Sequence, residues 1–140
     1  MSRENVDLIR HVIEAHERGD FEAVFAAYDP DIEWHVGRLL PHAPLDFEPV
    51  YHGHEGIRRF FREWLSAWQT VSFEYEQLID AGDRVVVLLN QRMRGRTSGM
   101  EIHWPDYAQV WTIRDGRIVR SEFFMQRDEA LAAVGLERPR

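Results

Sequence analysis

Hydrophobic and polar residues in the first part of the chain follow the period of two helices. The apolar positions of the first helix recur every three or four residues, and they are Val6, Ile9, Val12, Ile13 and Ala15. Gly19 predicts the end of this helix, because glycine readily adopts the left-handed backbone that often follows a helix. Asp20 then predicts the cap of a shorter second helix, and Pro30 predicts its end.

The next two segments break this helical period. Residues 31–36, DIEWHV, alternate between apolar and polar side chains, which is the pattern of a strand. Residues 37–50 contain Pro41, Pro44 and Pro49, so we expect neither a helix nor a central strand there. A connection of this length in a compact domain is typical of a functional lid or an irregular tip.

Residues 51–64, YHGHEGIRRFFREW, predict the start of a long third helix. Its apolar stripe is Ile57, Phe60, Phe61, Trp64, Leu65 and Trp68. Gly53 allows a tight entry into the helix, and Glu55 suits its positive end. His52 and His54 raise the question of a zinc site. Two histidines without a third ligand at a fixed spacing are a weak signal, so no metal is predicted.

After residue 70 the pattern changes to strands. We expect strands over 71–79, 84–94, 100–113 and 117–126, followed by a short helix over 127–136. The second strand is apolar on both faces at its start, which predicts a central position. Asp115-Gly116 is a strong hairpin signal. The order of elements predicts a single α+β domain over residues 1–140, in which helices cover the concave face of a curved antiparallel sheet.

Composition narrows the possible chemistry. The 140 residues contain no cysteine, and all 17 basic residues are arginine. Thiolate nucleophiles, disulfides and lysine Schiff bases are therefore excluded. The net charge of −7 argues against a nucleic-acid partner. No apolar run has the length of a membrane span and the N-terminus lacks a signal-peptide pattern, so we expect no membrane partner and a cytoplasmic location.

Three stretches together resemble the SnoaL-like branch of the NTF2-like superfamily: GDFEAVFAAYDPDIEWHV, YHGHEGIRRFFREW and VWTIRDGRIVRSEFFMQRDEALAAVGL. In that branch the third helix opens with a G-x-E-G-[IV]-x-x-[FW]-[FW] phrase. The last hairpin reads W-x-[IV]-x-D-G-[KR]-[IV], and both phrases stand here at the expected separation. The resemblance covers nearly the whole chain. It implies a cone-shaped fold with an internal pocket and a homodimer formed through the sheet.

The resemblance leaves the function open, because relatives include ketosteroid isomerases, polyketide cyclases, epoxide hydrolases, dehydratases and non-catalytic binding modules. The isomerases' base, tyrosine and protonated aspartate fall on Trp34, near Val12 and near Ala108. The cyclases' aspartate and histidine fall on Phe123 and Gln109. None of these residues matches the catalytic group of the relative.

The candidate catalytic residues come from the strands. If Ala108 faces the interior, strand alternation places Asp106 there too, where desolvation would raise its pKa and suit it to act as a base. His35 or His103 would be its partner. The expected ligand wall is Tyr28, Trp34, Tyr51, Phe61, Trp64, Trp68, Gln91, Phe123 and Met125.

Two functions remain open from the sequence. The first is a SnoaL-like pocket protein for a small, mostly apolar molecule, with cofactor-independent acid/base catalysis as an extension. That catalysis would be of the isomerase, cyclase, dehydratase or hydrolase type. The second is a non-catalytic ligand-binding or dimerisation module. Neither function requires a cofactor.

Overall fold

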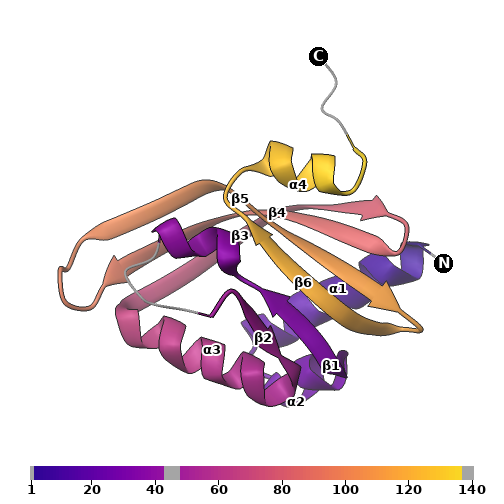
Figure 1. Ribbon diagram of the computed structural model, residues 1–140, viewed down its shortest axis with the longest axis horizontal. Helices are drawn as coiled ribbons and strands as arrows, with labels where there is room; N and C mark the ends of the chain where they lie inside the picture. The colour runs from indigo at the N-terminus through magenta and orange to yellow at the C-terminus, as the bar shows by residue number, and fades with distance from the viewer. Residues whose placement is uncertain (1, 43–47, 137–140) are drawn as a thin grey trace.

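The computed structural model describes residues 2–42 and 48–136 (Figure 1). Pro44 lies outside these ranges. The elements in the order of the chain are α1 (Ser2–Glu17), α2 (Phe21–Ala26), β1 (Tyr28–His35), the 3-10 helix η1 (Gly37–His42), β2 (Val50–His52), α3 (Gly53–Ala67), β3 (Trp68–Ala81), β4 (Arg84–Gly95), β5 (Glu101–Arg114), β6 (Arg117–Phe124) and α4 (Arg127–Ala133).

The strands of the described residues form one curved, unclosed sheet in the order β2-β1-β6-β5-β4-β3. Strands β3 to β6 form the expected antiparallel meander. Strand β1 lies beside β6 and runs parallel to it, a pairing that the sequence pattern did not predict. The predicted α+β fold of helices on a curved sheet is confirmed, with two departures. The pairing of β1 with β6 is parallel, and α4 packs on the face of the sheet opposite to α1, α2 and α3.

Strand β4 shows how the sheet separates two apolar layers. Val85, Val87 and Leu89 join the main core together with residues of α1, α2 and α3. Val86 and Leu88 point the other way and pack in a smaller cluster with residues of α4. The double-sided apolar pattern of this strand agrees with its expected position inside the sheet, between β5 and β3. Helices cover it on both faces and not on the concave face alone (Figure 1).

The turn between α1 and α2 forms as its sequence predicts. Gly19 has a φ of +75°, and the N–H of Asp20 donates to the carbonyl of Ala15 at 2.9 Å. The Asp20 side chain accepts a hydrogen bond from the Ala23 N–H at 3.2 Å and so caps α2. Pro30 does not end this helix. It lies within β1, where the pairing with β6 shifts register and no ladder donor is needed.

The proline-rich connection also differs from expectation. Residues Gly37–His42 form a 3-10 helix that includes Pro41. Proline fixes φ near about −65°, a value that a 3-10 helix accepts, so the prediction of no helix here was wrong for this half of the segment. Val50 then begins β2, a short strand at the edge of the sheet.

Candidate functional site

A small cavity lies between the helices and the inner face of the sheet. Its free volume is about 60 Å³, and aromatic side chains make most of its wall: Tyr28, Trp34, Phe60, Phe61, Trp64, Phe73, Tyr75, Tyr107, Trp111 and Phe123. Val12 and Ile13 of α1, Leu39 of η1 and Leu89 of β4 complete the apolar lining. In the part of the chain that the structure describes, no carboxylate lines this cavity.

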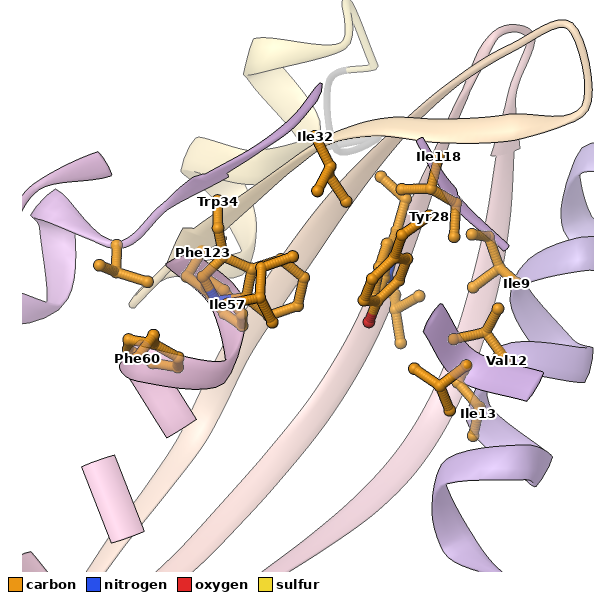
Figure 2. Close-up of a cluster of buried hydrophobic side chains, with 14 of the residues drawn as sticks. Ile9, Val12, Ile13, Tyr28, Ile32, Trp34, Ile57, Phe60, Ile118 and Phe123 are labelled. Carbon is orange, nitrogen blue, oxygen red and sulfur yellow. The ribbon is translucent and has the colours of Figure 1, made fainter. Parts of the chain in front are cut away.

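Trp34 is at the centre of the aromatic wall. Its ring centroid lies 5.3 Å from that of Phe123 and 5.8 Å from those of Tyr28 and Trp111. Figure 2 shows the Tyr28 ring between two groups of side chains, one from α1 and the other containing Trp34 and Phe123. These packed rings hold one another in place and make the wall rigid.

An open groove of about 730 Å³ adjoins the cavity, between α1, α2, α3 and β3. The two share five wall residues, His16, Phe61, Trp64, Phe73 and Tyr75. The groove contains apolar side chains that face solvent, among them Phe21 at 53% and Leu65 at 50% exposure. An apolar molecule therefore has a continuous apolar route from the surface to the cavity.

His16 stands where the groove meets the cavity. Its ring lies edge-on to Phe21 at 5.5 Å and to Phe73 at 6.3 Å between centroids. Burial lowers the pKa of His16 below its ordinary value, and the nearby Glu17 carboxylate offsets part of that change. The ring is therefore neutral at physiological pH. The sequence pattern did not identify His16, although its position four residues after Val12 places it on the buried face of α1.

Three tyrosines add polar groups to the wall. Burial raises the pKa of Tyr28 and of Tyr107 well above the ordinary value, and repulsion from Tyr75 adds to this. Burial, together with repulsion from Glu17, raises the pKa of Tyr75 to about 12. All three hydroxyls therefore stay protonated and neutral at physiological pH.

Gln91 and Gln109 are the buried amides of the wall. The Gln109 amide donates to the Ser121 hydroxyl at 2.7 Å. The Gln91 amide nitrogen reaches only the Met93 sulfur at 3.1 Å, and its carbonyl oxygen is buried without a hydrogen-bond partner. The indole N–H groups of Trp34 and Trp111 are also buried without a partner.

The predicted catalytic residues do not meet in this cavity. Asp106 is outside it, with a side chain that is 60% exposed and 3.9 Å from the Arg127 guanidinium. The inward orientation predicted for Asp106 is wrong because the alternation was assigned to the wrong face. Ala108 packs against the α4 side of the sheet, and the register of β5 shifts beside Pro105.

The two candidate histidines also lie outside the cavity. His103 is exposed. His35 is half-buried, and its Nε2 lies 2.8 Å from a Glu33 carboxylate oxygen. This contact is the main cause that lowers the pKa of Glu33. Since neighbouring residues of a strand face opposite ways, Trp34 takes the inward position and His35 cannot.

Six of the nine residues expected in the ligand wall do line the cavity: Tyr28, Trp34, Phe61, Trp64, Gln91 and Phe123. Tyr51 does not, because it is fully buried in the core and its hydroxyl donates to Glu63 at 2.8 Å. Trp68 packs behind Trp64 at 5.4 Å between ring centroids. Met125 is partly buried against the main core.

The entrance of α3 has a structural role. Gly53 has a φ of +70°, and a Cβ atom there would lie 3.1 Å from the Pro30 carbonyl oxygen. His54 donates through Nε2 to the Tyr28 carbonyl oxygen at 3.0 Å, which ties the helix to β1. Among the residues of known placement, no group of three or more histidine, aspartate or glutamate side chains could hold a metal ion.

Residues 9–121 match the SnoaL-like domain family. The chain belongs to this family. The resemblance was expected to place the catalytic groups of relatives at or near five positions of this chain. Val12, Trp34, Gln109 and Phe123 line the cavity, whereas Ala108 packs on the other face of the sheet. None of the five is an acid or a base.

Solved structures support the assignment of the fold. An NTF2-like protein of unknown function from Burkholderia pseudomallei is 26% identical, with 94% of this chain and 98% of that chain covered and a TM-score of 0.73. TerC, crystallised with polyporic acid, is 23% identical, with the same two coverages of 94% and 98% and a TM-score of 0.74.

A third similar structure is a hypothetical protein with a ketosteroid isomerase-like fold from Catenulispora acidiphila, in complex with trimethylamine. It is 16% identical, with 81% of each chain covered and a TM-score of 0.61. A comparison with curated protein sequences found no match. Among the described helices, none is long and apolar enough to cross a membrane.

Proposed function

We propose that this protein binds a small, mostly apolar molecule that lies in the groove and places one end in the aromatic cavity. The observation that carries the proposal is the wall of five residues, His16 among them, that the two spaces share. Hidden aromatic surface alone is ordinary core. An apolar route that opens to solvent is typical of a ligand site.

Size supports this division of the ligand between the two spaces. A cavity of about 150 Å³ holds benzene. The inner cavity, at about 60 Å³, has room for a smaller group. The groove, at about 730 Å³, falls within the range of small-molecule sites, which is about 300–1,000 Å³. The body of the ligand therefore lies in the groove.

The test is a titration of purified protein with butylbenzene, benzylacetone and para-butylphenol, followed by calorimetry and by the rise in Tm. Leu65→Asp places a charge in the groove and should weaken binding by about tenfold or more. Met100→Asp is the matched control, because Met100 is also apolar and 66% exposed but lines neither space. Absence of binding by all three probes, or equal loss in both variants, contradicts the proposal.

A second candidate function is cofactor-independent proton transfer with His16 as the base. The lowered pKa of His16 favours it, because a neutral imidazole can accept a proton from a carbon beside a carbonyl group. The proton would pass to the imidazole and return to the same carbon. Benzylacetone in D₂O should then gain deuterium beside its carbonyl with the wild type and not with His16→Gln. Exchange at the buffer rate in both samples leaves binding as the function.

Two further predictions concern the oligomeric state of the protein and its location in the cell. The homodimer through the sheet stays a prediction, which light scattering of the eluted protein would test. The cytoplasmic location also stays a prediction, which fractionation of the native host cells would test.

A further inference from the structure

Three buried polar atoms in the cavity wall have no hydrogen-bond partner. They are the indole N–H groups of Trp34 and Trp111 and the carbonyl oxygen of Gln91. Gln91 is only 1% exposed, and Trp34 only 2%. Leaving such groups unpaired away from water is costly, so folded proteins seldom contain several of them in one place.

These atoms occupy different parts of the wall. Along the β4–β5 ladder, Trp111 pairs with Val85 and Trp104 pairs with Gln91. Since a strand rises about 3.3 Å per residue, Val85 and Gln91 lie about 20 Å apart along β4. Trp34 belongs to the Trp111 end, because their rings lie 5.8 Å apart. Among the three unpaired atoms, the two donors therefore lie toward one end of the wall and the acceptor toward the other.

The wall carries no charge that could balance an ionic ligand. Its described side chains include no carboxylate, lysine or arginine, and His16 is neutral because burial lowers its pKa. The tyrosines are neutral as well, since burial raises their pKa values. A charged group would lose its hydration here without a counter-ion.

We propose that the cavity selects a ligand whose inserted end is uncharged and carries either a hydrogen-bond acceptor or a hydrogen-bond donor. The acceptor, such as a ketone oxygen, receives the indole N–H of Trp34 or Trp111. The donor, such as a phenolic hydroxyl, binds the Gln91 carbonyl oxygen. This inference rests on the proposed function, because it assumes that the cavity holds a ligand, and it adds the chemistry that the ligand must have.

Four probes with a common phenylbutane skeleton test the inference. Butylbenzene has neither polar group, benzylacetone has only the ketone, para-butylphenol has only the hydroxyl, and raspberry ketone has both. We expect a polar group that enters the cavity to improve the dissociation constant by about tenfold. Because the cavity admits one end of the ligand, raspberry ketone should also bind about tenfold more tightly than butylbenzene. Phenylbutyrate, which is charged, should bind more weakly than benzylacetone.

Variants assign each gain to its partner. Gln91→Leu should abolish the benefit of the hydroxyl and preserve that of the ketone. A Trp34→Phe, Trp111→Phe double variant should do the reverse. Trp68→Phe is the matched control, because the Trp68 indole N–H is also buried and unpaired but lies outside the cavity wall. It should change neither benefit. Circular dichroism confirms that each variant is folded.

The outcomes separate this inference from the proposed function. If no probe binds, butylbenzene included, the proposed function fails and the inference fails with it. If butylbenzene and raspberry ketone bind equally well, the binding function stands and the selection for polar groups is overturned. Tighter binding of phenylbutyrate than of benzylacetone by an Arg58→Gln, Arg62→Gln double variant, which lacks the arginines of the groove, also overturns it. So does a loss of the hydroxyl benefit in Trp68→Phe that equals the loss in Gln91→Leu.

Discussion

Replacement of Gln91 by leucine should make the ligand-free protein more stable. The side chain is 1% exposed, and its carbonyl oxygen has no partner. An unpaired buried acceptor costs about 1–3 kcal/mol. The bond that the variant loses, from the amide nitrogen to the Met93 sulfur, is weak because a thioether is a poor acceptor. The expected net gain is about 1–2 kcal/mol.

The matched variant Gln109→Leu should have the opposite effect. The two residues have the same type and similar burial, but the Gln109 amide donates to Ser121 at 2.7 Å. Its removal leaves the buried Ser121 hydroxyl without this partner, which costs about 1–3 kcal/mol. Because both variants introduce leucine, the difference between their stabilities reports whether the original amide was hydrogen-bonded.

Urea unfolding of protein that was first unfolded and refolded, to remove any co-purified ligand, measures both effects. In thermal unfolding of a domain of this size, a change of 1 kcal/mol in the free energy of unfolding corresponds to about 3–5 °C in Tm. A loss of more than about 1 kcal/mol in Gln91→Leu would show that the amide is satisfied, and the reasoning about its orphaned oxygen would then be refuted. Saturating para-butylphenol should offset about 1.4 kcal/mol of the advantage of the variant, because the wild type is expected to bind this probe about tenfold more tightly than the variant does.

Two further predictions concern His16 and Arg127. Burial lowers the pKa of His16 in the folded state below its pKa in the unfolded state. The contribution of His16 to stability is therefore full at a pH above the unfolded-state pKa, and it is lost as the pH falls through the folded-state pKa. His16→Gln should therefore reduce the fall in stability that the wild type shows between about pH 7 and pH 5 in urea unfolding, and an unchanged slope would contradict this. Arg127 donates to Glu76 and, at 3.1 Å, to the Pro105 carbonyl oxygen, so Arg127→Met should cost about 1–3 kcal/mol in the same assay. Asp106→Asn should cost less than about 0.5 kcal/mol, because that carboxylate is exposed; equal costs would contradict the assignment.

Much of the fold could be predicted because its local signals agree with its tertiary structure. Gly19 and Asp20 set the α1–α2 turn, and the Asp115-Gly116 hairpin has positive φ at both residues. Pro30 misled the prediction because the residues around it lack a partner in the β1–β6 ladder, which no local pattern reveals. The parallel pairing of β1 with β6 is a contact between distant segments and has no sequence period of its own.

The site was harder to predict than the fold, because strand alternation gives two faces without naming the inner one. The assumption that Ala108 faces inward placed Asp106 in the cavity, whereas Gln109 and Trp111 occupy that face. Gln91 was expected in the ligand wall, and it does line the cavity. His16 was not predicted because the helical period of α1 identifies apolar residues, and a histidine on the same face does not add to that pattern.

The pairing of β1 with β6 has a consequence for the kinetics of folding. Trp34 on β1 is held beside Ser121, which lies near the other end of the described chain. The β3–β6 meander can form from neighbouring hairpins, but β1 must close a long loop before its side chains gain any contact with the sheet. Indole fluorescence of Trp34 should therefore change in a later, slower phase than the circular dichroism of the meander. The aromatic wall of the cavity would be the last part of the molecule to be completed.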